Sequence, residues 1–360
     1  MEVTDAETYA LRVPIEGPFG DARASVDERF WIVVELETDA GHVGTGWLAT
    51  WRVPELFERY LADLAATVVG RDPHETAAVR EALREQTLYY PGEVGFSAHP
   101  RSAIDVALWD LKAQDAGVPL FRLLGGADRE VPVYVSGMDA GRDEATLAAF
   151  HGEFADEGFT RFKTKVGNRS LDEDAARVAA VREAVGPDAE LFVDANQTYT
   201  PATALRAAER FDASDVGWFE EPVAPWNRQG YERVSRGTDV PVASGEMVYR
   251  LERLAALVEA GTVDVVQPDL IRGGGVSGLV DAAHLAARHD LPLAPHIHHA
   301  VSGHVVSAAR TGWLVEYIPE YDAGAVLDGA PPVDGGTLTL PDRPGHGYRV
   351  SDEARATYTL

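Results

Sequence analysis

Residues 190–222, ELFVDANQTYTPATALRAAERFDASDVGWFEEP, contain the pattern that decides the fold. Two short apolar runs, ELFVDAN and VGWFEEP, flank the segment PATALRAAERF, in which apolar residues recur at three- and four-residue spacing. An apolar run, a segment of helical period and a second apolar run predict a β-α-β unit with parallel strands. Both runs carry an acidic residue where the strand is expected to end, Asp194 and Glu220.

The same alternation continues on both sides of this stretch, from about residue 130 to residue 318. Helical patterns such as DEDAARVAAVREAVG and VSGLVDAAHLAARHD separate short apolar runs. There are eight such runs: VPVYVS, RFKTKV, ELFVDAN, VGWFEEP, VPVASGE, VDVVQPD, LPLAPHI and GWLVEYI. Eight strands that alternate with helices predict an α/β fold, the (β/α)8 barrel.

The N-terminal part has a different pattern. RFWIVVELETDAGHVGTGWLAT predicts two strands joined by a turn at TDAGH, and PELFERYLADLAATVVG, PHETAAVREALREQTL and HPRSAIDVALWDLKAQDAG predict three helices. The sequence therefore predicts three regions: an α+β domain over residues 1–125, the barrel over 126–318, and a segment over 319–360 that returns to the first domain.

Composition narrows the possible partners and the possible metal ligands. The net charge of −26 is spread along the chain, which argues against binding to nucleic acid or to an anionic membrane surface. A diffuse acidic surface is typical of proteins from salt-loving organisms. Because the chain has no cysteine, disulfides and thiolate metal sites are excluded. With no long apolar run and no signal-peptide pattern, we expect a cytoplasmic protein.

Residues at the expected strand ends are candidates for catalysis, because the C-terminal ends of barrel strands converge around one axis. All of them are polar or ionisable: Ser136, Lys163, Lys165, Asp194, Glu220, Glu246, Asp269, His296 and Glu316. Asp194, Glu220 and Glu246 end three consecutive strands and are spaced 26 residues apart. Three converging carboxylates form a site for a hard cation, and we expect one Mg²⁺ per subunit.

Two lysines lie on one strand. Lys163 and Lys165 are two residues apart, so both side chains should point into the barrel. An ammonium buried next to another ammonium and a divalent cation loses its proton easily, which makes one of the pair a candidate general base. The alternative is that both only bind an anionic substrate.

The segment PHIHHAVSGH, residues 295–304, holds four histidines. His296 ends the seventh strand next to Asp269 at the end of the sixth, so Asp269 can orient the imidazole for acid/base chemistry. His298 would share the His296 face one pleat further out and is a possible substrate contact, whereas His299 points away and His304 lies in the following helix; both are interpreted as structural.

Glu316 ends the eighth strand, between His296 and the first strand. In a site of this kind we expect it to be protonated and to donate a hydrogen bond to developing negative charge. The alternative is an ionised residue at the rim of the barrel.

The short motifs FKTKVG, VDANQ, FEEP, SGE, QPD, PHI and LVEY, in this order, resemble those of the enolase superfamily, in its mandelate racemase subgroup. The resemblance covers nearly the whole chain and implies a modified TIM barrel with an α+β capping domain. It implies that Asp194, Glu220 and Glu246 bind Mg²⁺, and that Lys165 and the His296–Asp269 pair are acid/base groups on opposite faces of the substrate.

The resemblance also implies the residues that contact the substrate. Lys163 and Glu316 would contact its carboxylate, and Ser136 and Asn196 match positions next to the substrate. The segments EGPFGDARASVDE and TWRVPE would close over the barrel and select the substrate, with Arg23 and Trp51 as candidates. Relatives in this subgroup are commonly symmetric, so a homo-oligomer is expected.

The resemblance implies abstraction of a proton next to a carboxylate, which produces an enediolate stabilised by Mg²⁺, Lys163 and Glu316. The polar segment GDARASVDER and the extra histidines favour a lyase that removes water from a sugar acid, an aldonate or aldarate, to give a 2-keto-3-deoxy acid. A racemase or epimerase of a 2-hydroxy acid would use the same residues. The sequence leaves open which of Lys165 and His296 removes the proton.

Three other interpretations have less support. A zinc hydrolase would use His296 and His298 as ligands, and a sugar-acid-binding protein without activity would not need both lysines. The glycine-rich IRGGGVSG, residues 271–278, could bind phosphate, but it lacks the Gly-Lys-Ser/Thr ending and follows the sixth strand, which favours a tightly packed turn.

Overall fold

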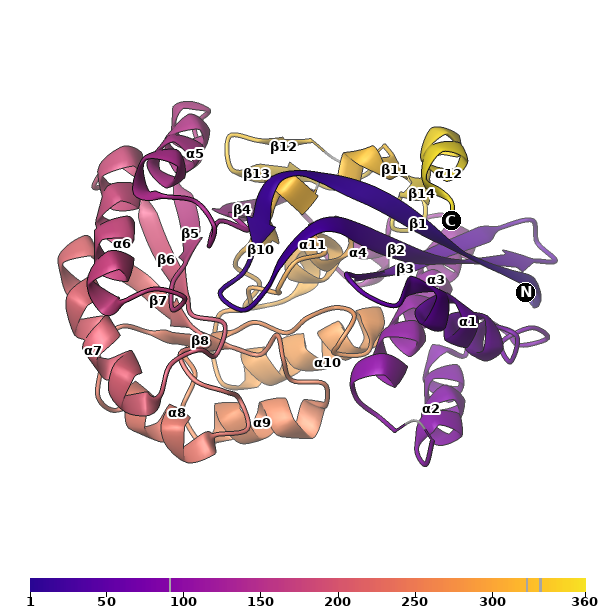
Figure 1. The fold of residues 1–360 in the computed structure, drawn as a ribbon. Coiled ribbons are helices and arrows are strands. Elements are labelled where there is room, and N and C mark those ends of the chain that lie inside the picture. The colour runs from indigo at the N-terminus through magenta and orange to yellow at the C-terminus, as the bar shows by residue number, and fades with distance from the viewer. Residues whose placement is uncertain (91, 322, 330–331) are drawn as a thin grey trace.

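The computed structural model describes residues 1–90, 92–321, 323–329 and 332–360. An antiparallel sheet with helices on one side lies next to a barrel of parallel strands (Figure 1). The N-terminal domain contains the strands β1 (Val3–Gly20), β2 (Ser25–Thr38) and β3 (Val43–Thr50) and the helices α1 (Pro54–Ala65), α2 (Thr76–Thr87) and α3 (Ala98–Asp115).

The three N-terminal helices and the β2–β3 hairpin agree with the sequence prediction, whereas β1 was not predicted. β1 pairs with β2 along most of its length, from Val3 opposite Thr38 to Gly20 opposite Ser25. This long hairpin extends from the N-terminal sheet across the mouth of the barrel (Figure 1). Its tip therefore reaches the ends of the barrel strands, where the candidate site residues lie.

The barrel sheet runs in the order β4-β5-β6-β7-β8-β9 with parallel pairing, and β10 pairs with β4. Its strands are β4 (Glu130–Ser136), β5 (Arg161–Lys165), β6 (Glu190–Asp194), β7 (Val216–Glu220), β8 (Val242–Ser244), β9 (Val265–Val266) and β10 (Val315–Tyr317). Its outer helices are α5 (Glu144–Asp156), α6 (Leu171–Val185), α7 (Pro201–Phe211), α8 (Arg228–Ser235), α9 (Leu251–Glu259), α10 (Gly275–Arg288) and α11 (His299–Ala308).

The seventh apolar run, LPLAPHI, is in the expected place but does not form a regular strand. It contributes only isolated bridges, from Leu293 to Val266 and Gly312 and from His296 to Asp269. Pro292 and Pro295 have no backbone N–H to donate to a ladder, which accounts for the interruption. The eightfold barrel predicted from the sequence is thus present, with one position closed by bridges alone.

An apolar layer fills the barrel directly below the candidate site. It consists of Tyr134, Phe192, Trp218, Ala243, Val265, Ala294 and Leu314. Most of these residues stand two positions before a candidate site residue on the same run, so both side chains point into the barrel. The rings of Phe192 and Trp218 stack with centroids 3.5 Å apart. This layer closes the barrel beneath the polar groups and excludes water from that side.

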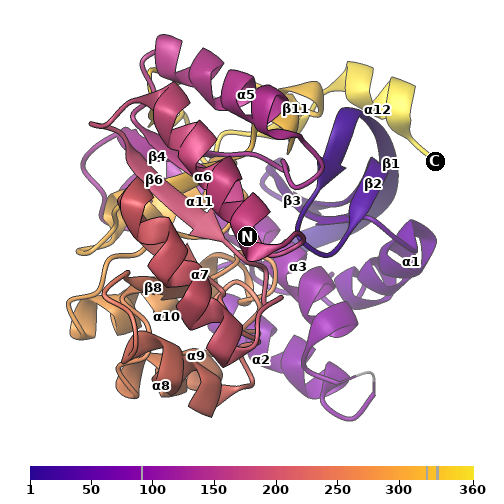
Figure 2. The ribbon, with the colours of Figure 1, turned by 60° about the vertical axis from the view of Figure 1, so that its left-hand side comes forward.

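The C-terminal segment contacts the N-terminal domain and also extends the barrel sheet. α12 (Asp352–Tyr358) lies beside β1, and Thr359 bridges to Leu11 (Figure 2). β13 (Thr337–Thr339) pairs with both β12 (Val333–Asp334) and β4, and β11 (Leu327–Asp328) pairs with β14 (Arg349–Val350). Within the described residues, no helix combines the length and apolarity needed to cross a bilayer.

Candidate active site

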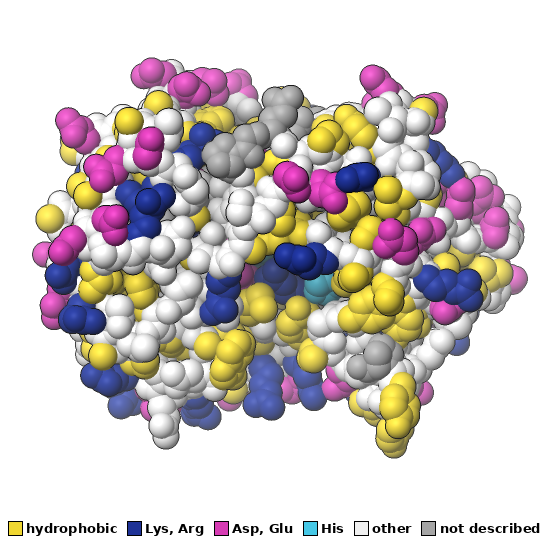
Figure 3. All heavy atoms as spheres, viewed as in Figure 1, with side chains coloured by type: hydrophobic (Ala, Val, Ile, Leu, Met, Phe, Trp, Pro, Cys, Tyr) yellow, Lys and Arg dark blue, Asp and Glu magenta, His cyan; other side chains and the backbone are white. Residues whose placement is uncertain are grey.

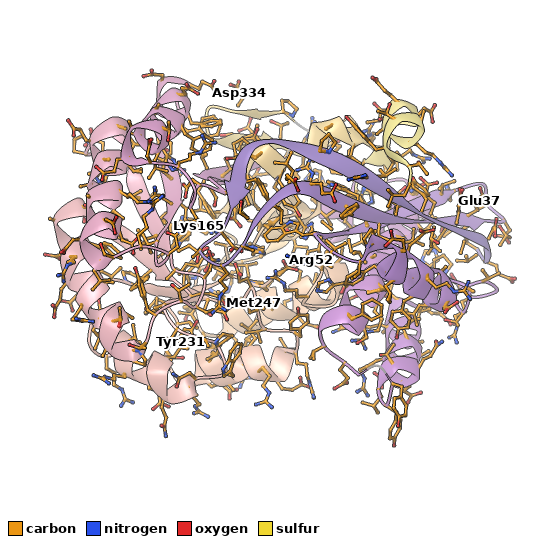
Figure 4. The ribbon with its side chains drawn as sticks, viewed as in Figure 1. Glu37, Arg52, Lys165, Tyr231, Met247 and Asp334 are labelled. Carbon is orange, nitrogen blue, oxygen red and sulfur yellow. The ribbon has the colours of Figure 1, made fainter. Side chains whose placement is uncertain are left out.

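A hollow opens between the N-terminal domain and the barrel, with basic side chains and a histidine inside it (Figure 3). The same view with side chains as sticks places Lys165, Arg52 and Met247 around this region (Figure 4). Lys165 comes from the end of β5, Met247 from the loop after β8, and Arg52 from the segment after β3. The hollow is thus lined by both domains, and Lys165 is the candidate residue that Figure 4 places beside it.

Three buried carboxylates meet at the C-terminal ends of the barrel strands. Asp194 and Glu220 end β6 and β7, and Glu246 lies just beyond β8. Each offers an oxygen within 4.8 Å of the oxygens of the other two. The adjacent strands therefore bring together the three residues that the 26-residue spacing placed at neighbouring strand ends. A set of three carboxylate oxygens, with no sulfur ligand, fits a hard cation such as Mg²⁺.

Both lysines point into the barrel and face carboxylates. Lys163 Nζ lies 2.8 Å from Glu220 Oε1 and 2.8 Å from Glu316 Oε1, and Lys165 Nζ donates to Asp194 Oδ2 at 2.6 Å. Burial by itself lowers the pKa of Lys165, but the Asp194 carboxylate more than offsets this, so the pKa is raised above its usual value. The carboxylates around each ammonium, which the sequence argument did not count, thus outweigh both burial and the neighbouring ammonium in setting the lysine pKa.

The expectation that Glu316 is protonated is wrong. Burial raises the pKa of Glu316, but the Lys163 ammonium and, next, His296 hold it well below its usual range. Its second oxygen, Oε2, accepts a hydrogen bond from the backbone N–H of Ile297 at 2.9 Å. Glu316 is accordingly an ionised group that fixes the Lys163 ammonium and the backbone next to His296.

His296 and Asp269 form a buried pair. His296 Nδ1 lies 2.8 Å from Asp269 Oδ2, and Asp269 Oδ1 accepts from the backbone N–H groups of Ile271 and Arg272, each at 2.7 Å. Burial raises the pKa of Asp269, but the Arg272 guanidinium and, next, the hydrogen bond from His296 hold it well below its usual range, so Nδ1 is the donor in this pair. His296 Nε2 therefore faces the site, 3.2 Å from Glu246 Oε2.

Lys165 and His296 approach the carboxylate triad from different sides of the barrel. Lys165 comes from β5 and His296 from the seventh run, and the strand order places β10 and β4 between them on the shorter way round. Burial lowers the pKa of His296, but Glu246 and Asp269 raise it more, so the net shift is upward. Two nitrogen groups thus flank the space next to the triad, and each can hold a proton.

The remaining histidines of PHIHHAVSGH have other surroundings. His298 has φ 53° and immediately precedes α11, so the strand alternation expected for it does not apply. It lines a small apolar pocket together with Trp31, Trp47 and Glu316, and burial lowers its pKa to about 4. His299 packs edge-on against Tyr317.

His304 has a structural role, as the sequence indicated. Its Nδ1 accepts from the Phe121 N–H at 3.1 Å and its Nε2 donates to the His346 carbonyl at 3.0 Å.

The other predicted contact residues lie close to the site but differ in what they contact. Asn196 donates its N–H to Asp194 Oδ1 at 2.8 Å and its Nδ2 to Asp194 Oδ2 at 3.1 Å, so it orients a carboxylate of the triad. Ser136 is fully buried, and its hydroxyl has no hydrogen-bond partner within the part of the chain that the structure describes.

In the loops expected to select the substrate, Arg23 Nη2 donates to the Gln197 carbonyl at 2.9 Å, and the Trp51 ring packs edge-on against Phe19. The side chains of residues 16–18, which belong to the expected loop segment, lie outside the described part.

Three buried groups around the site were missed. Gln267 donates to Glu220 Oε2 at 2.8 Å, Asp139 accepts from the Lys165 N–H at 3.0 Å, and Glu221 accepts from Gln197 Nε2 at 2.6 Å. Gln267 could have been found, because it stands two residues before Asp269 and faces the same way. Asp139 lies in a loop whose path no sequence periodicity predicts.

Comparison with known proteins places this geometry in context. Residues 3–125 match the mandelate racemase / muconate lactonizing enzyme N-terminal domain, and residues 146–354 match the enolase C-terminal domain-like family. The chain is 33% identical over 388 aligned positions to D-galactarolactone cycloisomerase of Agrobacterium fabrum, which covers 100% of this chain and 99% of that protein.

Solved structures superpose over almost the whole chain. A racemase from Streptomyces coelicolor with bound magnesium has a TM-score of 0.94 at 30% identity and covers 99% of this chain and 100% of that chain. The L-talarate/galactarate dehydratase of Salmonella typhimurium, with Mg and L-lyxarohydroxamate, has a TM-score of 0.93 at 28% identity. The alignment covers 100% of this chain and 93% of that chain.

Proposed function

The chain belongs to the mandelate racemase subgroup of the enolase superfamily, and on this premise we propose that it removes water from a sugar acid. The substrate is an aldonate or aldarate and the product a 2-keto-3-deoxy acid. The observation that carries the proposal is that Lys165 and His296, both buried, flank one cluster of three carboxylates from different sides. Dehydration needs this arrangement, because one group removes a proton from one face of the substrate while a second group protonates the leaving hydroxyl.

Asp194, Glu220 and Glu246 would hold one Mg²⁺. When bound, the ion supplies positive charge that stabilises the negative charge growing on the carboxylate of the substrate. The oxygen-only donor set and the burial of the triad support this cofactor, and two structurally similar proteins contain magnesium. Asn196 and Gln267 fix the orientation of Asp194 and Glu220.

Either Lys165 Nζ or His296 Nε2 takes the α-proton, depending on the configuration of the substrate. The Asp269 carboxylate keeps the His296 Nδ1–H in place, so that Nε2 is the nitrogen that exchanges protons. The opposite group donates a proton to the β-hydroxyl, which leaves as water while the α,β double bond forms. The resulting enol then takes a proton at the β-carbon and becomes the keto acid.

Lys163 and Glu316 act together at the substrate carboxylate. The Lys163 ammonium, held between Glu220 and Glu316, adds positive charge where the enediolate develops. Since Glu316 is ionised, its contribution is to hold Lys163 and the Ile297 N–H, and no hydrogen bond from a protonated Glu316 is needed. Ser136 and His298 lie within the same region and are the remaining proposed substrate contacts. The protein is proposed to be a homo-oligomer whose partners are small carboxylates.

The test is to incubate the protein and Mg²⁺ with a panel of aldonates and aldarates and to measure keto-acid formation. Galactarolactone is included because a full-length relative is named for it. We expect a 2-keto-3-deoxy acid from at least one open-chain acid, and none from Lys165→Ala or His296→Asn.

Two results of this panel, and one result of a metal analysis, would overturn the dehydratase proposal. Inverted acid without keto acid identifies an epimerase, and conversion of the lactone alone identifies a cycloisomerase. Stoichiometric zinc retained against excess Mg²⁺ would restore the zinc-hydrolase interpretation.

A further inference from the structure

An aspartate from the N-terminal domain caps a barrel helix next to the site. Asp105, on α3, is almost completely buried, and its two carboxylate oxygens accept hydrogen bonds from the backbone N–H and the hydroxyl of Ser277, at 2.8 and 2.6 Å. Ser277 lies in the first turn of α10, which begins at Gly275 and has no side-chain cap of its own. A carboxylate that accepts from this turn does what an N-cap residue normally does, and the helix dipole favours its charge.

This contact explains the glycine-rich segment before α10. A Cβ on Gly275, whose φ is +74°, would lie 2.5 Å from Asp105 Oδ2, so no other residue fits beneath the carboxylate. A Cβ on Gly273 would lie 2.7 Å from the Asp269 carbonyl oxygen. The tight-turn interpretation of IRGGGVSG therefore holds, and the phosphate interpretation is wrong, because a carboxylate of the protein already occupies the start of the helix.

The capped turn is directly continuous with Asp269. The N–H of Gly275 donates to the Leu270 carbonyl at 2.8 Å, and the N–H of Gly273 donates to the Asp269 carbonyl at 2.8 Å. Asp269 in turn accepts from the Arg272 N–H and holds His296. The short turn 269–275, held by these backbone hydrogen bonds, thus connects the helix start capped by Asp105 to the carboxylate that orients the imidazole.

We propose that Asp105 is a positioning residue: by capping α10 from the other domain, it holds the turn 269–275 and thereby the orientation of the Asp269–His296 pair. Its importance for catalysis rests on the proposed acid/base role of His296. The geometry makes alignment of His296 depend on docking of α3 against α10. Small displacements of an acid/base group reduce the rate strongly, so a residue that never touches substrate can control turnover.

The surroundings of Asp105 support a role beyond ordinary packing. Burial raises its pKa to about 6, although the two bonds from Ser277 lower it. Trp109, one turn along α3, donates its Nε1 to the Ser277 hydroxyl at 2.8 Å. Arg80 pairs with Asp281 at 2.8 Å at the same interface, but both side chains are partly exposed. Arg80→Gln is therefore a control that removes this ion pair while both hydrogen bonds from Ser277 to Asp105 remain.

The first test needs no substrate. Histidine labelled with ¹⁵N reports the ring nitrogens of the eleven histidines, and His296→Asn identifies the signals of His296. We expect Asp105→Ala to shift the His296 ring signals, Asp105→Asn to shift them less because it keeps one acceptor for Ser277, and Arg80→Gln to leave them unchanged. Unchanged His296 signals in Asp105→Ala overturn the proposal. Should Asp105→Ala not fold, Ser277→Ala takes its place.

The second test uses an acid that the protein turns over with Mg²⁺. We expect Asp105→Ala to lower kcat by about 10- to 100-fold with little change in KM. It should slow α-proton exchange on the His296 side while leaving exchange on the Lys165 side. Equal loss on both sides, or equal loss in Arg80→Gln, would show a general structural effect and contradict the proposal. If no acid is turned over, the proposed function fails, and the labelled-histidine result still decides the role of Asp105.

Discussion

Arg23 Nε donates a hydrogen bond to the carbonyl oxygen of Asn196 at 2.5 Å, which joins the tip of the N-terminal hairpin to the turn behind the carboxylate triad. This turn has an unusual backbone: Asn196 and Gln197 have φ of 42° and 66°, and Glu221 in the neighbouring turn has φ of 38°. A left-handed conformation costs a residue with a side chain about 1–2 kcal/mol, so surrounding contacts must hold it. Arg23 is one such contact, and its expected place in a loop that selects the substrate stays a prediction.

Replacing Arg23 should therefore weaken metal binding before any substrate is present. Without the guanidinium, the turn of Asn196 relaxes and Asn196 orients Asp194 less well. We expect Arg23→Met to raise the dissociation constant for Mg²⁺ by about 10-fold, as is common when a group that orients a ligand is lost. Calorimetric titration of the metal-free protein measures this. Arg12→Met, which removes an exposed pair with Glu28 in the same hairpin, is the control, and equal affinities in both variants would refute the role of Arg23.

Among the three carboxylates of the triad, Glu246 makes the fewest other short contacts with side chains. Its nearest cations are His296 Nε2 at 3.2 Å and Arg272 Nη1 at 3.5 Å, whereas Glu220 also accepts from Lys163 and Gln267. Glu246→Gln should therefore lower Mg²⁺ affinity by about 100-fold or more, because loss of a direct ligand costs at least as much as loss of its support. The fold should persist by circular dichroism. The exposed Glu252→Gln on α9 should bind like the wild type; unchanged affinity in Glu246→Gln would remove it from the metal site.

His304 should make the stability depend on pH. Burial and the adjacent His346 lower its pKa to about 3 in the folded protein, against about 6.5 in an unfolded chain. Between these two pKa values the unfolded state binds one more proton than the folded state. The contribution of His304 to the free energy of unfolding is therefore lost as pH falls through this window, by about 1.4 kcal/mol per pH unit. The difference in unfolding free energy between wild type and His304→Gln should shrink from pH 6.5 to pH 5.

Denaturant titrations at each pH measure this difference in unfolding free energy. His284→Gln, on an exposed position of α10, is the control for losing a histidine. A difference between wild type and His304→Gln that stays constant over this range would show that His304 does not carry the pH dependence.

The acidic composition predicts a response to salt. With 58 acidic and 32 basic side chains, carboxylates on the surface repel one another in the folded state. Raising KCl from about 0.1 M to about 1 M shortens the screening length from about 10 Å to about 3 Å, so the thermal unfolding midpoint should rise. Sucrose at matched osmolarity separates screening from a general solute effect. A midpoint that is the same at both KCl concentrations would contradict the salt-adapted interpretation.

Much of the barrel could be predicted because its information is local. The apolar runs and the helical periods between them place the strand ends, where Asp194 and Glu220 lie in register and Glu246 follows β8. The interrupted seventh strand is the exception, although Pro292 and Pro295 were visible in the sequence as residues that cannot donate to a ladder. β1 escaped prediction, because residues 3–20 contain charged residues and prolines that weaken the strand pattern.

The charge states in the site could not be predicted from the sequence, because they depend on which groups face each other. Lys163 and Lys165 were expected to depress each other's pKa, but each ammonium lies within 3 Å of a carboxylate. Glu316 is ionised for the same reason. Contacts between the domains could not be predicted from the sequence either, because residues such as Asp105 and Ser277 are 172 residues apart in the chain and no local pattern links them.

The central claim is that Lys165 and His296 exchange protons with the α-carbon of a sugar acid from two sides of one metal site. The most direct measurement is NMR of sugar acids in D₂O with Mg²⁺, comparing the wild type with Lys165→Ala and His296→Asn. The account predicts α-proton exchange by the wild type, loss of exchange in the variant that lacks the base for a given configuration, and persistence in the other. Exchange that survives in both variants, or is absent from the wild type with every acid, would contradict it.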